Sequence, residues 1–152
     1  MIDRFAELIE ELGTFLGLSL FVDRHGACAL QVHGKTKIQM QLDLSHQNLF
    51  MASIAIEIPP GKFRENVLRD GLKMNCLPDP RPASIGYLPA NNHLTLHQSL
   101  PLEILDGKRL AGFFGAFTAE VEIWIEAIRN GKTAPINLAP DLPSSKPFGI
   151  KL

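Results

Sequence analysis

Apolar residues recur at helical spacing in three stretches of the chain, residues 3–16, 62–77 and about 107–130. In each stretch they stand three or four positions apart, with charged residues between them. This period predicts an amphipathic helix. Asp3 and Asp106 are suitable N-cap residues for the first and third helices. The pattern therefore predicts three helices, each with an apolar side to bury.

Alternation with a period of two fills much of the chain between these helices. Short turns between such runs favour antiparallel neighbours, so we expect a meander of strands after the first helix and a hairpin after the second. The expected strands are residues 18–22, 28–32, 38–42, 50–58, 84–89 and 93–100.

The order of these elements is helix, three or four strands, helix, two or three strands, helix. It implies an α+β fold in which three helices pack on a strongly twisted antiparallel sheet. A length of 152 residues suits one domain, which we place at residues 1–131. Residues 132–152 lose the periodicity and are rich in proline. They are predicted to form a flexible C-terminal tail.

The charge and the hydropathy of the sequence argue against two classes of binding partner, nucleic acids and membranes. The net charge of −1 and the isoelectric point of about 6.5 argue against a nucleic-acid binder, which needs a basic surface to displace counterions from phosphates. The sequence has no apolar run of the roughly 20 residues that span a bilayer, and its first residues do not resemble a signal peptide. We therefore expect a cytoplasmic protein that inserts into no membrane.

The residue types that carry catalysis or bind metals form no recognisable site. On a strand, His93 and His97 would lie about 13 Å apart, too far to share one metal ion. Cys28 and Cys76 have no neighbouring base and are expected to be reduced, buried thiols. The chain also lacks phosphate-binding and nucleophile-elbow motifs. The sequence therefore predicts neither an enzyme nor a cofactor.

An excess of apolar surface is the main functional signal. All three predicted helices have apolar stripes, and most predicted strands have one apolar face. A single sheet with three helices must either be covered on both faces or keep some apolar surface for a partner. The two interpretations are a complete monomer core, or a dimer interface together with a groove for an extended client.

Several short sequence phrases, that is, segments of three to six residues, resemble the class I type III secretion chaperones of the CesT (Tir chaperone) family in their order and spacing. The resemblance covers about residues 3–130 and leaves out the tail. The phrases are Phe15-Leu16-Gly17-Leu18, Asp23-Arg24-His25-Gly26-Ala27-Cys28, Ile56-Glu57-Ile58-Pro59, Leu72-Lys73-Met74-Asn75, Ile85-Gly86-Tyr87, Leu94-Thr95-Leu96 and Leu102-Glu103-Ile104-Leu105-Asp106, followed by a helix with Phe113, Phe117 and Trp124.

This resemblance implies a homodimeric virulence chaperone in the cytoplasm of a Gram-negative bacterium. It would bind the N-terminal region of one or more secreted effectors in extended form and keep them soluble and competent for secretion. It would also meet the secretion ATPase or sorting platform. The alternative is a homodimeric regulatory or assembly module of the same fold, unrelated to secretion. A small enzyme with an unrecognised pocket is a third hypothesis.

The resemblance also suggests which residues bind partners. The second helix and the following strand should form the dimer, and the apolar residues on two sides of that helix agree with this in part. The first helix and parts of the sheet should bind the effector, although a plain core role is the competing interpretation for these residues. The predicted dimer residues are Val67, Leu68, Gly71, Leu72, Ile85 and Tyr87. The predicted effector-binding residues are Phe5, Leu8, Ile9, Leu12, Ile38, Met40 and Phe50.

Overall fold

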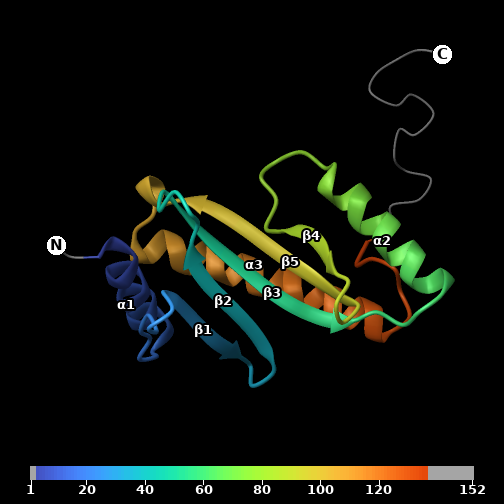
Figure 1. Ribbon diagram of the computed structural model, residues 1–152, viewed down its shortest axis with the longest axis horizontal. Helices are drawn as coiled ribbons and strands as arrows, with labels where there is room; N and C mark the ends of the chain where they lie inside the picture. The colour runs from blue at the N-terminus through green and yellow to red at the C-terminus, as the bar shows by residue number, and fades with distance from the viewer. Residues whose placement is uncertain (1–2, 137–152) are drawn as a thin grey trace, which may run out of the picture.

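The computed structural model describes residues 3–136, which form three α-helices and one five-stranded sheet (Figure 1). The α+β prediction is confirmed, and the three helices begin and end within two residues of their expected bounds. The elements are α1 (Arg4–Leu16), β1 (Ala27–Val32), β2 (Thr36–Leu42), β3 (Asn48–Glu57), α2 (Lys62–Asn75), β4 (Ser84–Leu88), β5 (His93–Pro101), a short 3-10 helix (Leu102–Ile104) and α3 (Gly107–Arg129).

The sheet is antiparallel throughout, in the order β1-β2-β3-β5-β4. Its register places Met40 opposite Met51 and Leu49 opposite Leu100. Because β2, β3 and β5 each have a strand on both sides, only β1 and β4 are edge strands. The predicted meander and hairpin are therefore present, joined by the pairing of β3 with β5.

α1 and α3 cover one face of the sheet, and α2 lies along the edge strand β4. α3 contacts β2 and β3, and α1 packs against α3. Figure 1 looks onto the opposite face, with α3 behind the strands. Along β2, Ile38 and Met40 are buried toward the helices, whereas Lys37, Gln39 and Gln41 are exposed on the other side. One face of the sheet is therefore core, and the other is open.

The core between the helices and the sheet is built around α3. Trp124 and Phe117 on α3 are fully buried, and the indole nitrogen of Trp124 donates a hydrogen bond to Glu120 Oε1 at 3.1 Å. Burial raises the pKa of Glu120. Leu8 of α1 and Met51 of β3 are fully buried in the same cluster. The long third helix therefore connects α1 to the middle of the sheet.

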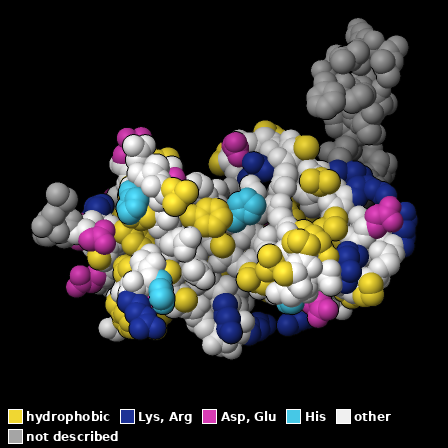
Figure 2. Space-filling model, viewed as in Figure 1, with side chains coloured by type: hydrophobic (Ala, Val, Ile, Leu, Met, Phe, Trp, Pro, Cys, Tyr) yellow, Lys and Arg dark blue, Asp and Glu magenta, His cyan; other side chains and the backbone are white. Residues whose placement is uncertain are grey.

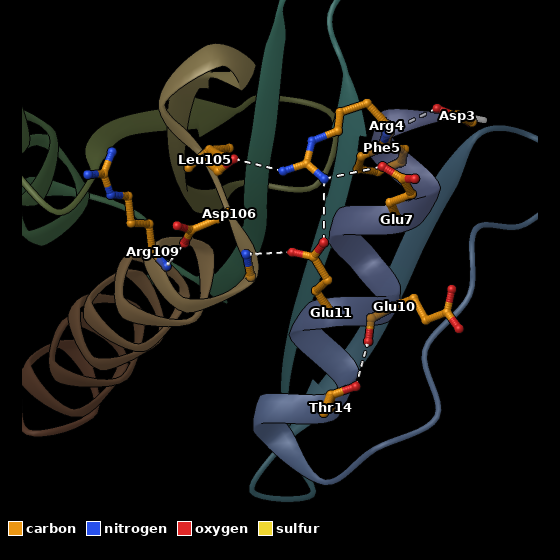
Figure 3. Close-up of polar contacts among 11 residues, drawn as sticks. Asp3, Arg4, Phe5, Glu7, Glu10, Glu11, Thr14, Leu105, Asp106 and Arg109 are labelled. Atoms are coloured by element: carbon orange, nitrogen blue, oxygen red, sulfur yellow. Dashed lines mark hydrogen bonds and ion pairs between the residues drawn. The ribbon is translucent and has the colours of Figure 1, made fainter. Parts of the chain in front are cut away.

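A polar contact fixes α1 against the start of α3 (Figure 3). Glu11 Oε2 accepts a hydrogen bond from the backbone nitrogen of Gly107 at 2.7 Å, which satisfies one of the free N–H groups of that helix terminus. Arg4 donates to the carbonyl oxygen of Leu105 at 3.0 Å and lies 3.4 Å from Glu11. A Cβ at position 107 would stand 2.6 Å from the Cβ of Glu11, so the close approach requires glycine.

Two expectations need correction. Residues 18–22 pair with no strand; they run as an extended segment beside α1, and the backbone nitrogen of Leu18 bonds to Gly13. The first residues after Gly131 pack against the domain, since Thr133 donates a hydrogen bond to Asp70 of α2 and Ala134 is buried. The remainder of the predicted tail, residues 137–152, lies outside the described residues.

Candidate protein-binding surfaces

Residues 3–136 contain no group of three histidine, cysteine, aspartate or glutamate side chains placed to hold a metal ion. In the same part of the chain, no helix is long and apolar enough to cross a bilayer. Burial raises the pKa of the Cys28 thiol, and the negative charge of Asp23 raises it further, so Cys28 is a poor nucleophile. Cys76, expected to be buried, is exposed at the end of α2.

Six of the seven predicted effector-binding side chains lie in the core. They are between 0% and 2% exposed, because α3 and the sheet cover the apolar stripe of α1, and the helices cover the inner face of β2. A client cannot touch them while the domain stays folded, so their assignment to an accessible surface is corrected. These residues are Phe5, Leu8, Ile9, Leu12, Ile38 and Met40.

Phe50, the seventh predicted residue, points to the open face of the sheet. Its ring stacks on His97 of β5, with ring centres 5.8 Å apart and planes inclined by 29°. Partial burial lowers the pKa of His97, which favours a neutral ring beside Phe50. Figure 2 shows hydrophobic side chains next to histidines over the middle of this face. The sheet thus carries an aromatic platform on the side that no helix covers.

A hollow of about 320 Å³ lies beside this platform. The small residue Ala52 and Ile54, which is 56% exposed, both line it. Lys37 is the charged residue that lines it. We call the surface formed by Ala29, Lys37, Gln39, Gln41, Phe50, Ala52, Ile54 and His97 the open face. The sequence pattern did not identify it, because alternation shows that a strand has two sides and not which side stays uncovered.

Backbone hydrogen bonding decides what can cover the open face. The central strands β2, β3 and β5 are paired on both sides, so their backbone groups are already used. A chain segment lying over them must satisfy its own backbone hydrogen bonds. An amphipathic helix satisfies its backbone hydrogen bonds internally. A segment that contributes only side chains to the open face satisfies its backbone hydrogen bonds with water at the rim of that face.

The β1 edge offers the opposite chemistry. β1 pairs only with β2. On its other side Asp23 bonds to both the backbone nitrogen and the carbonyl oxygen of Ala27, so the free backbone donors and acceptors of β1 begin after Ala27. Beside α1 and the neighbouring segment 18–22 is a second hollow, and the large apolar side chains nearby are exposed, by 51% at Leu18 and 75% at Phe21. Gly13 allows the segment to pass, because a Cβ there would stand 2.5 Å from the carbonyl oxygen of Leu18.

Five of the six predicted dimer residues come together where α2 meets β4, and the sixth, Val67, is buried in the core. Gly71 and Ile85 are buried in this contact, while Leu72 is 67% exposed. A Cβ on Gly71 would stand 2.8 Å from Ile85 Cγ2, which explains a glycine in the middle of the helix. A shallow hollow at the free edge of β4 is lined by Leu68, Gly71, Leu72, Ile85, Gly86 and Tyr87, and we call it the edge hollow.

Asn75, to which the sequence assigned no binding role, blocks part of the β4 edge. Its side-chain amide donates to the carbonyl oxygen of Ile85, and its Oδ1 accepts from the backbone nitrogen of Ile85, both at 2.8 Å. These bonds use the outward backbone groups of β4 at that position, as Asp23 uses those of Ala27 on β1. Each edge strand thus has one residue whose outward groups are taken, and the rest of either edge is available to a strand from another chain.

Several solved structures share this fold. The Yersinia pestis type III secretion chaperone SycH, in complex with a stable fragment of YscM2, has a TM-score of 0.64 and 19% identity over 78% of this chain and 97% of that chain. The chaperone in the Pseudomonas aeruginosa ExoT–SpcS complex has a TM-score of 0.61 and 20% identity over 80% and 97%. A chain of the HopA1–SchA chaperone–effector complex has a TM-score of 0.66 and 18% identity over 84% and 100%.

No curated protein sequence shows a significant match to this chain. The model of the Tir chaperone protein (CesT) family matches residues 7–125, which include the whole sheet, α2, and most of α1 and α3. The match covers well over half of the sequence. The chain belongs to the Tir chaperone protein (CesT) family.

Proposed function

We propose that this protein is a type III secretion chaperone that acts in the bacterial cytoplasm and has no catalytic activity. It binds the N-terminal region of one or more effectors and holds that region in a non-globular form until secretion. The observation that carries the proposal is the apolar hollow around Phe50 and Ile54 on the open face, which the protomer leaves uncovered on the fold of this family. The complexes of SycH, SchA and SpcS with their protein partners support it.

Two kinds of client contact follow from the geometry. The free edge of β1 pairs with an extended client strand, whose backbone hydrogen bonds give affinity with little dependence on sequence. The open face receives apolar side chains from a client helix, around Phe50 and Ile54. Both contacts replace water at sites that already exist in the folded domain, so binding needs no ATP.

The edge hollow is the proposed homodimer interface. Leu72 and the half-buried Tyr87 would be covered by the same surface of a second protomer around a two-fold axis. A dimer doubles the available client surface, because each protomer keeps its own open face and its own β1 edge. The loaded complex would then be delivered to the secretion ATPase or sorting platform.

Co-purification from the native bacterium tests the client proposal. The tagged chain should recover a secreted protein, identified by mass spectrometry, and the N-terminal fragment of that protein should bind the purified chaperone. Ile54→Asp should reduce capture of that fragment at least about tenfold, because it places a charge in the apolar hollow.

Ile104→Asp is the matched control, since Ile104 is 40% exposed in the short 3-10 helix, outside the open face. It should capture the fragment as well as the unchanged protein does. Equal capture by folded Ile54→Asp would contradict the proposed client surface.

A further inference from the structure

The side of α3 that faces away from the sheet is uncovered and uncharged. From Leu110 to Ala119 the helix contains no charged residue. Phe113 within this stretch is 38% exposed, and Ile123, one turn beyond Ala119, is 47% exposed, so large apolar side chains meet solvent on this side of α3. We call the exposed surface formed by Gly112, Phe113, Gly115, Ala116, Ala119 and Ile123 the outer face of α3.

The two glycines of the outer face border open space within residues 3–136. Glycine is the poorest helix-forming residue after proline, so one in the middle of a helix needs a reason. At Gly71 and Gly107 a Cβ would lie 2.8 Å and 2.6 Å from neighbouring side chains. At Gly112 and Gly115 a Cβ would have no atom within 4 Å. A neighbouring helix that packs on this face would use the space that these two glycines leave.

Charges at the two ends of the outer face identify that neighbour. Lys108 lies at the start of the helix and Glu126 near its end, about 27 Å apart at 1.5 Å per residue. Neither side chain takes part in an ion pair within residues 3–136. A second copy of α3, turned antiparallel, would bring the lysine of each copy to the glutamate of the other.

The same antiparallel arrangement also places large side chains of one helix opposite small side chains of the other. An antiparallel pair with its two-fold axis between residues 117 and 118 places Ile123 of one copy opposite Gly112 of the other. It places Ala116 opposite Ala119, so the two helix backbones can approach closely where no large side chain intervenes. The outer face is thus complementary to itself in both charge and shape, as a two-fold interface must be.

We propose that the outer face of α3 is a second self-association surface, at which two copies pair through antiparallel α3 helices. The pairing is independent of client binding and of the edge hollow. A single helix pair buries much less than the roughly 800 Å² per partner of a standard interface, so the contact is weak and depends on concentration. If the edge hollow forms a dimer, pairing through α3 joins two dimers into a tetramer.

Analytical ultracentrifugation of the full chain over a concentration series tests this proposal. The unchanged protein should show a larger species at high concentration, and Ala116→Asp should remove it. Lys108→Glu and Glu126→Lys should each weaken association roughly tenfold, because the ion pair occurs twice under two-fold symmetry. The double reversal should restore association, which a loss of folding could not do.

Gly112→Ala separates this role from a merely structural one. With open space around the added methyl group, the substitution should raise the melting temperature of the protomer while weakening the larger species. An unchanged association constant in Gly112→Ala or Ala116→Asp would overturn the proposal. So would a single dimeric species at every concentration, although that result would leave the edge-hollow dimer intact. A heteromeric partner on α3 in place of a second copy would also overturn it.

Discussion

Strand β3 has apolar side chains on both of its sides, and those on one side are buried while those on the other are accessible. Leu49 and Met51 point toward the helices and are fully buried. Phe50 and Ile54 point the other way and stay accessible, and Ile54 is 56% exposed. One protomer thus seals one face of its sheet and leaves the other to solvent. This difference shows that a binding surface lies where no other element of the fold covers the apolar side chains, and not where apolar residues are most frequent in the sequence.

The largest expected effect compares one substitution type on the two faces. Leu8→Glu should unfold the domain, because it buries an unpaired carboxylate and removes a core side chain, a combination that costs more than about 4 kcal/mol. Ile54→Glu should leave the domain folded. Circular dichroism and urea denaturation of both variants measure the difference. A folded, cooperative Leu8→Glu protein would contradict the division between covered and open faces.

The edge of the sheet gives the next largest effect. Leu72→Asp should weaken the proposed dimer by at least about 2 kcal/mol, because the side chain lies in the edge hollow, and should leave the protomer folded. Light scattering at a fixed concentration reports the change in mass. Leu44→Asp is the control, since Leu44 is fully exposed in the turn before β3. A Leu72→Asp protein that still elutes as a folded dimer would exclude this interface.

Two glycine substitutions should change stability in opposite directions. Gly71→Ala should lower the free energy of unfolding by about 1–3 kcal/mol, because the added Cβ collides with Ile85. Gly112→Ala should raise it by up to about 1 kcal/mol, because α3 gains helix propensity with no collision. Urea denaturation at low protein concentration gives both values. If both substitutions changed the free energy of unfolding in the same direction, the space around Gly71 and the space around Gly112 would not differ as described.

The smallest expected effect is a dependence on pH at the open face. Partial burial lowers the pKa of His97 below its ordinary value of 6.5, so the unfolded chain takes up a proton at a higher pH than the folded one. This contribution to stability is complete above about pH 6.5 and is lost as the pH falls. Stability measured from pH 7.5 to 5 should decrease less in His97→Gln than in the unchanged protein. Identical slopes would remove His97 as the cause.

Local pattern predicted the elements well, and long-range packing decided the sites. The spacing of apolar residues placed all three helices, because that spacing reflects the geometry of the helix itself. The same pattern in α1 and α2 could not distinguish Leu8, which is fully buried, from Leu72, which is 67% exposed. That difference arises because α3 covers α1, whereas Leu72 lies at the margin of the contact between α2 and β4, in a hollow that residues 3–136 leave open. Asn75 was missed because an asparagine near a helix end carries no pattern of its own.

The contact between Glu11 and Gly107 joins residues 96 positions apart, and this separation affects how the protein is made. At about 5–20 residues per second, roughly 5–20 seconds pass on the ribosome between synthesis of α1 and synthesis of the start of α3. During that interval the apolar stripe of α1 has no α3 to cover it. A newly made molecule of this protein therefore has the same exposure to aggregation as the clients it is proposed to protect.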